Sequence, residues 1–115
     1  MSRRNWRLYV EDIIESIMWI ERYVEHMDFE EFKSDRKTTD AVVRNFEIIG
    51  EASKFIPEGV KHTHDDVDWK GVVGLRNRIA HEYFGISPVV LWHIIKEELP
   101  KLKGQMENIL KKESG

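Results

Sequence analysis

Apolar residues recur every three or four positions along most of this chain, and that periodicity constrains the fold more than any other feature. Residues 6–27 carry one apolar stripe, which predicts a long amphipathic helix. Similar spacing returns in residues 39–56, 68–84 and 88–112. No segment shows the two-residue alternation of a half-buried strand. The pattern therefore predicts an all-α protein whose four main helices form an antiparallel bundle.

Polar caps and a proline set the boundaries in the first half of the chain. Residues 28–34 predict a short extra helical turn, followed by a polar connection. The second long helix is expected to begin near Thr39 or Asp40, because either side chain can cap a helix N-terminus. Pro57 is expected to end it, since proline cannot continue a helix without losing a backbone hydrogen bond.

The second half has equally clear boundaries. Gly85 is expected to stop the third helix, and Ser87 followed by Pro88 predicts the start of the fourth. Pro100 is expected to bend or break this last helix. Residues from about 104 to 115 are expected to form a frayed C-terminal tail.

Length and composition limit the class of protein. A chain of 115 residues has room for one domain, residues 1–115, with one core. The net charge of −3 argues against a general nucleic-acid coat protein, although a site that meets one or two phosphates needs only a local cluster of cations. The chain has no cysteine, no apolar run long enough for a membrane span and no signal-peptide pattern. We therefore expect a cytoplasmic protein without a membrane partner.

Residues 76–83 hold the side chains best suited to chemistry. On a continuous helix Arg76 and Tyr83 lie within about 20° of each other, and Asn77 lies one turn before His81. Arg76 and His81 are then about 140° apart around the axis and about 7.5 Å apart along it, so one helix is poorly placed to aim both at one phosphate. Two copies that meet across a two-fold axis can do so. This geometry predicts a homodimer with the site at its interface.

The residue types in this run suit metal-free cleavage of RNA. His81 can move protons near neutral pH, as general base or general acid. Arg76 can stabilise charge that develops on a phosphate, and Asn77 can position the substrate by a hydrogen bond. Tyr83 can stack on a base or offer its hydroxyl. Attack by a 2′-hydroxyl on the adjacent phosphodiester would cut RNA and spare DNA. The plain alternative is that Arg76 and His81 are solvated and that Tyr83 packs in the core.

Two further groups of polar residues could have a functional role or an ordinary surface role. In an extended loop His62 and His64 would point the same way and could chelate a metal, but a solvated polar loop is the commoner outcome, and neither a metal site nor a cofactor is assigned. Glu51 follows a glycine, where helices can approach closely. It is a candidate supporting partner for Arg76 or Arg44, or else a surface carboxylate.

The run Arg76-x4-His81-x-Tyr83, with Asn77 directly after the arginine, resembles the signature of HEPN-domain, HepT-like ribonuclease toxins. Residues 44–52, which contain the sequence Ile-Gly-Glu-Ala, resemble the second-helix segment of that family. Further matching segments surround the motif on both sides. The resemblance spans about residues 8–102.

This resemblance implies a dimeric bundle in which the arginine and histidine of both chains line a cleft that cuts RNA without metal. It also implies a partner, a minimal nucleotidyltransferase that acts as the antitoxin. In such toxin–antitoxin pairs the partner transfers AMP from ATP to the motif tyrosine, here Tyr83, and silences the nuclease. The added nucleotide would bring negative charge and bulk beside Arg76, in the place of the substrate phosphate.

Two other functions stay open at this point. The first is a non-catalytic binding module for a nucleotidyltransferase, whose polar cleft holds a nucleotide and loses it in Arg76→Ala. The second is a purely structural dimeric scaffold, for which His81→Ala would change neither RNA cleavage nor nucleotide binding.

Overall fold

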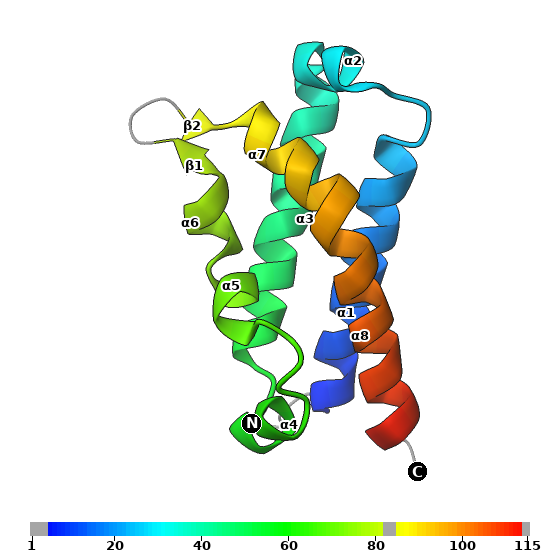
Figure 1. Cartoon of the computed structure of the whole chain (residues 1–115), viewed down its shortest axis with the longest axis vertical. Coiled ribbons are helices and arrows are strands. Elements are labelled where there is room, and N and C mark those ends of the chain that lie inside the picture. Colours follow the sequence, from blue (N-terminus) through cyan, green and yellow to red (C-terminus); the bar gives the residue numbers. More distant parts are fainter. Residues whose placement is uncertain (1–4, 82–84, 114–115) are drawn as a thin grey trace.

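The computed structural model describes residues 5–81 and 85–113, which form an antiparallel helical bundle (Figure 1). In chain order the elements are α1 (Trp6–Tyr23), α2 (Phe29–Ser34), α3 (Arg36–Lys54), α4 (Glu58–Thr63), α5 (Trp69–Val73), α6 (Leu75–Ile79), β1 (Ala80–His81), β2 (Gly85–Ile86), α7 (Pro88–His93), the π-helical turn η1 (Ile94–Glu98) and α8 (Leu99–Glu113). Helices α1 and α3 are the first two rods, α5 with α6 the third, and α7, η1 and α8 together the fourth. The predicted all-α bundle is confirmed, with one pair of two-residue strands as the β structure of the described residues.

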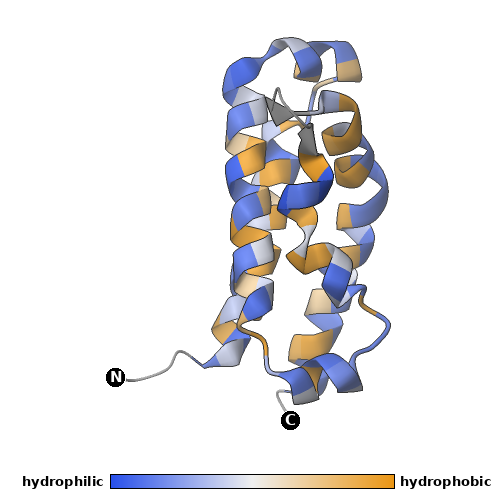
Figure 2. Cartoon of the chain, turned by 90° about the vertical axis from the view of Figure 1, so that its left-hand side faces the viewer, coloured by the Kyte–Doolittle hydropathy of each residue, from blue (hydrophilic) through white to orange (hydrophobic). Residues whose placement is uncertain are grey.

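One hydrophobic core lies between the four rods. Bands of apolar and polar residues follow one another along the helices (Figure 2). The apolar residues of each helix gather on one side and form a stripe that faces the core. Ile17 of α1, Phe46 of α3, Ile79 of α6 and Met106 of α8 are all fully buried in this core. Burial of each such side chain contributes about 1.5–3 kcal/mol to folding. Within the described residues, no helix is both long and apolar enough to cross a membrane.

Helix α3 begins earlier than the sequence suggested. The short turn predicted over residues 28–34 is present as α2, but α3 starts at Arg36, not near Thr39 or Asp40. The reason is a cap, because the Asp35 carboxylate accepts hydrogen bonds from the Thr38 backbone N–H at 3.1 Å and from the Thr38 hydroxyl at 3.0 Å. These bonds hold the pKa of Asp35 below its ordinary value.

The third rod differs most from the prediction of one helix over residues 68–84. It consists of two five-residue helices, α5 and α6, separated by Gly74, and α6 ends at Ile79. The backbone then pairs as an antiparallel hairpin in which His81 lies opposite Gly85. The Ser87 N–H donates to the Ile79 carbonyl at 3.0 Å and extends the pairing. The motif is therefore divided between a helix and a strand.

The polar stretch after Pro57 is not an extended loop. Helix α4 begins at Glu58 and contains the exposed His62, whereas His64 follows the helix, is buried and lies 2.9 Å from the Glu113 carboxylate. The two histidines therefore do not have the extended-loop arrangement that would let them chelate together. Among the residues that the structure describes, no three side chains of metal-ligating type form a cluster.

The fourth rod is continuous from Pro88 to Glu113. The Ser87 side chain caps it as predicted, accepting from the Val90 N–H at 3.3 Å. Pro100 does not break it, because the preceding turn is π-helical and the Leu99 N–H donates to the Ile94 carbonyl, five residues back. This wider turn accommodates a residue without an N–H.

The C-terminal segment is also more ordered than expected. The frayed tail predicted from about residue 104 is helical as far as Glu113. Met106 and Ile109 anchor this part of α8, since both are buried in the core. A contact from Arg7 to the Glu113 carbonyl ties the end of α8 to the start of α1.

Candidate active site

Arg76 and Asn77 point outward from α6. Leu75 and Ile79, four residues apart, bury their side chains and fix which face of this short helix meets the core. Arg76 and Asn77 lie on the opposite face, and the Arg76 side chain is 78% exposed. A guanidinium in this position keeps its fork of donors available to a phosphate in solution.

A glycine in α3 sets the distance between α3 and the third rod. A Cβ atom on Gly50 would lie 3.3 Å from the Val73 carbonyl oxygen, so a larger residue would push α5 away. This close approach places the Arg76 Nε 3.8 Å from the Glu47 carboxylate of α3. The glycine of the Ile-Gly-Glu-Ala segment therefore controls where the motif arginine sits.

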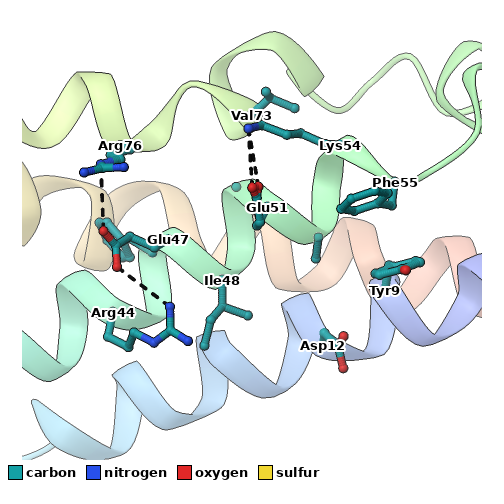
Figure 3. A pocket seen from close by; sticks show the side chains of 13 residues that line it. Tyr9, Asp12, Arg44, Glu47, Ile48, Glu51, Lys54, Phe55, Val73 and Arg76 are labelled. Carbon is teal, nitrogen blue, oxygen red and sulfur yellow. Dashed lines mark hydrogen bonds and ion pairs between the residues drawn. The ribbon is translucent and has the colours of Figure 1, made fainter. Parts of the chain in front are cut away.

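A surface cavity of about 500 Å³ lies beside Arg76 (Figure 3). Helix α3 forms its floor, with α1 on one side and the third rod on the other. Three cations and three carboxylates line the cavity together with apolar and aromatic side chains. The cations are Arg44, Lys54 and Arg76, and the carboxylates are those of Asp12, Glu47 and Glu51. This balance means that the cavity of a single chain is not strongly basic.

The carboxylate that meets the arginines is Glu47, not Glu51. Glu47 lies 3.9 Å from Arg44 and 3.8 Å from Arg76, whereas the ion pair of Glu51 runs to Lys54 at 3.4 Å (Figure 3). The expected pairing of Glu51 with an arginine is thus replaced by Glu47, although Glu51 still lines the cavity. Glu47 precedes Arg76 by 29 positions, and the periodicity of α3 alone does not separate it from Glu51.

The relation between Asn77 and His81 also differs from the prediction. They are not one helical turn apart, since α6 ends at Ile79 and the His81 backbone belongs to β1. Tyr83 lies outside the described residues. The angle of about 140° between Arg76 and His81 held only for a continuous helix.

An ion pair that the sequence did not reveal holds α6 against the fourth rod. Arg78 donates two hydrogen bonds to the Glu98 carboxylate, at 2.8 Å and 2.7 Å. This contact raises the pKa of Arg78 and lowers the pKa of Glu98 from their ordinary values. Glu98 ends the π-helical turn η1, so the irregular turn presents the carboxylate that orients α6.

Comparison with known proteins agrees with this arrangement. The family model described as "Ribonuclease HepT-like" matches residues 13–109. A probable ribonuclease HepT of Thermococcus cleftensis is 43% identical over 95% of this chain and 99% of its own length. A putative RNase of Methanocaldococcus jannaschii is 40% identical over 93% of this chain and 98% of its own length. A putative RNase of Caldanaerobacter subterraneus is 39% identical over 93% of this chain and 96% of its own length. No solved structure matches the chain significantly. Because the match covers most of the chain and includes the motif segment, this protein belongs to the HepT-like ribonuclease family.

Proposed function

We propose that this protein is a metal-independent endoribonuclease, the toxin of a cytoplasmic toxin–antitoxin pair. The observation that carries the proposal is the Arg76 guanidinium, exposed on α6 beside a cavity, in a chain whose relatives are named as ribonucleases. His81 follows five residues later on β1. Arginine supplies a charge for the scissile phosphate and histidine a proton carrier, which together suit cleavage of an RNA chain.

The reaction begins when His81 takes the proton of a ribose 2′-hydroxyl. The 2′-oxygen forms a bond to the adjacent phosphorus, and the bond from phosphorus to the 5′-oxygen breaks. The leaving oxygen receives a proton from the His81 imidazolium, so the products are a 2′,3′-cyclic phosphate and a 5′-hydroxyl, and His81 returns to its neutral form. Arg76 stabilises the negative charge that builds on the phosphoryl oxygens, and Asn77 positions the phosphate by a hydrogen bond.

Glu47 supports Arg76 without immobilising it. At 3.8 Å the contact is longer than a charge-assisted hydrogen bond, so Arg76 can turn from Glu47 to a phosphate at little cost. Glu51, on the floor of the same cavity, keeps Lys54 beside the substrate path. These carboxylates orient the cations and take no part in proton transfer.

The site works as a homodimer and is regulated through Tyr83. Arg76 and His81 of both chains line one cleft, and a minimal nucleotidyltransferase antitoxin transfers AMP from ATP to the Tyr83 hydroxyl, with release of pyrophosphate. The modification adds a phosphate and a bulky nucleoside within seven residues of Arg76 in the chain. The added phosphate competes with RNA for the guanidinium.

The test is cleavage of single-stranded and transfer RNA in EDTA by protein whose intact mass excludes AMP on Tyr83. We expect cleavage of RNA and none of DNA of the same sequence. His81→Ala should lower the rate by about 10²- to 10⁴-fold and Arg76→Ala by about 10²- to 10³-fold. Arg36→Ala is the matched control, because Arg36 is 91% exposed at the far end of α3. Unmodified wild type that leaves every RNA intact, or loses activity in EDTA, contradicts the proposal.

A further inference from the structure

A second surface cavity of about 500 Å³ is formed by α4, α5 and the connection between them, and we call it the α4–α5 cavity. Val73 lines this cavity and also the cavity beside Arg76, so the two cavities share a wall. Figure 1 shows α6, α5 and α4 following one another towards the lower end of the bundle. The two cavities therefore lie one after the other along the third rod.

Basic side chains from both helices line the α4–α5 cavity. Lys61 and His62 belong to α4, and Lys70 belongs to α5. Lys70 precedes Arg76 by six residues, which is about 9 Å at the rise of an α-helix. A helical nucleic-acid strand carries one phosphate per about 3.4 Å, so this distance corresponds to about two or three nucleotides. An RNA chain that meets Arg76 can therefore also reach Lys70.

Lys61 is held in an unusual position for a lysine. Its side chain is only 14% exposed, and its ammonium lies over the Trp69 ring, 5.8 Å from the ring centre. The Trp69 ring N–H donates to the His64 carbonyl at 3.0 Å, which fixes the orientation of the ring. A lysine side chain that is already ordered in this way loses less conformational entropy when it binds an anion.

The nearest carboxylate leaves the charge of Lys61 available. Glu58 lies 3.9 Å from the Lys61 ammonium, which is too long for a hydrogen bond, and the Glu58 side chain is 94% exposed. Asp65, the other carboxylate that lines the cavity, is exposed as well. A phosphate can therefore replace Glu58 beside Lys61 at little cost.

We propose that the α4–α5 cavity binds the backbone of the RNA substrate, about two or three nucleotides from the phosphate that Arg76 contacts. Lys61 and Lys70 each neutralise one backbone phosphate, and the RNA chain passes Lys54 and Val73 on its way from Arg76. Contacts of this type set the register of the RNA on the protein without reading its sequence. The inference rests on the proposed function and deepens it, because it gives the nuclease a second contact with its substrate.

The experiment measures RNA binding without cleavage. The probe is a fluorescent RNA of about twelve nucleotides, long enough to span both cavities, with 2′-O-methyl groups that block the reaction. At 0.1 M salt, the double variant Lys61→Gln/Lys70→Gln should bind it about 10- to 30-fold more weakly by fluorescence anisotropy. The slope of log Kd against log salt should fall by about 1.4, or about 0.7 for each lysine. With unmodified RNA of the same sequence, KM should rise at least about tenfold and kcat should change less.

Two further variants separate the cavity from packing and from net charge. Lys70→Glu changes an exposed side chain and leaves the contact between Lys61 and Trp69 in place, so it should weaken binding in a protein that circular dichroism shows to be folded. The matched control is Lys33→Gln/Lys37→Gln, which removes the same charge from two exposed positions in α2 and the first turn of α3. This control should bind RNA within about twofold of wild type.

Each outcome decides for or against the RNA site. Wild-type affinity in Lys70→Glu, or an equal loss in the control, overturns it even where the wild type cuts RNA. If AMP binds with the same dependence on Lys61 and Lys70 as the long RNA, the cavity is a site for a free nucleotide and the proposal fails. Lysine-dependent binding of an RNA that stays uncut when unmodified supports the site and refutes the nuclease function instead. A wild type that does not bind the RNA overturns both.

Discussion

The ion pair between Arg78 and Glu98 lets the orientation of α6 be tested separately from the chemistry of Arg76. The perturbation is a double-mutant cycle of Arg78→Ala, Glu98→Gln and the two together. The pair makes two charge-assisted hydrogen bonds, at 2.8 Å and 2.7 Å, but both side chains are 38% exposed. Exposed ion pairs contribute about 0.2–1 kcal/mol, and the two-point geometry favours the upper end, so we expect a coupling free energy of about 1 kcal/mol.

The effect on thermal stability follows from the size of the domain. An unfolding entropy of about 2.1 cal/mol/K per residue gives a decrease in Tm of about 4 °C for the loss of 1 kcal/mol. RNA cleavage should fall about tenfold, although Arg78 does not belong to the proposed catalytic pair, because a five-residue helix that loses this tether no longer holds Arg76 in register with Glu47. KM for RNA should change less than kcat.

The stabilisation by the Arg78–Glu98 ion pair should decrease as the pH falls. The hydrogen bonds from Arg78 hold the pKa of Glu98 below its ordinary value of 4.5. Because the folded-state pKa is depressed, the stabilisation is fully present above pH 4.5 and is lost as pH falls through the lowered folded-state value. Wild type and Glu98→Gln should therefore differ in stability at neutral pH and converge in acid.

The measurement is urea unfolding followed by circular dichroism, at one fixed protein concentration because the proposed dimer would couple to folding. The pair Arg36–Asp40 is a matched control, since it is a single contact at 3.6 Å between strongly exposed side chains and should show less coupling. A coupling free energy below about 0.2 kcal/mol for Arg78 and Glu98 refutes the tether. So does a coupling that stays constant across the acid range.

Three further substitutions test the packing that positions the site. Gly50→Ala should cost about 1–3 kcal/mol in urea unfolding and also slow RNA cleavage, because its Cβ would press on the Val73 carbonyl at 3.3 Å. Gly104→Ala, whose Cβ would meet nothing within 4 Å, should be neutral or stabilising, and equal effects at both positions would disprove the close approach. Phe46→Ala should cost about 3–5 kcal/mol, since Phe46 is fully buried, and a cost below 1 kcal/mol by the same assay would place it outside the core. Ser87→Ala should lower the Tm by about 4 °C through loss of the helix cap, and an unchanged melting curve would count against that role.

Local signals predicted most of the helices. The apolar stripe of α1, the capping box of α2 and the Ser87-Pro88 start of the fourth rod could all be predicted from the sequence, because each depends on residues within about four positions. The start of α3 at Arg36 also has a local signal, because Asp35 is a good N-cap. Asp35 lies in a polar stretch in which Thr39 and Asp40 are good caps as well, so local sequence does not single it out.

The end of α6 had no comparable signal. Residues 80–84 contain no proline or glycine, and strands of two residues are too short to show an alternating pattern. The end of α6 is set by backbone pairing after the buried Ile79, whose carbonyl accepts from the N–H of Ser87, eight positions later. The division of the motif between helix and strand is therefore a property of the tertiary structure.

The sequence alone determined the all-α bundle, the family and the residues of the motif, since helical periodicity and short motifs need no knowledge of neighbouring elements. Only the tertiary structure decided that Glu47, not Glu51, meets Arg76, and that Arg78 reaches Glu98. Both contacts depend on how far each rod is rotated about its axis and how closely it approaches the next. Rotation and approach are set by long-range packing at sites such as Gly50, for which local spacing carries no signal.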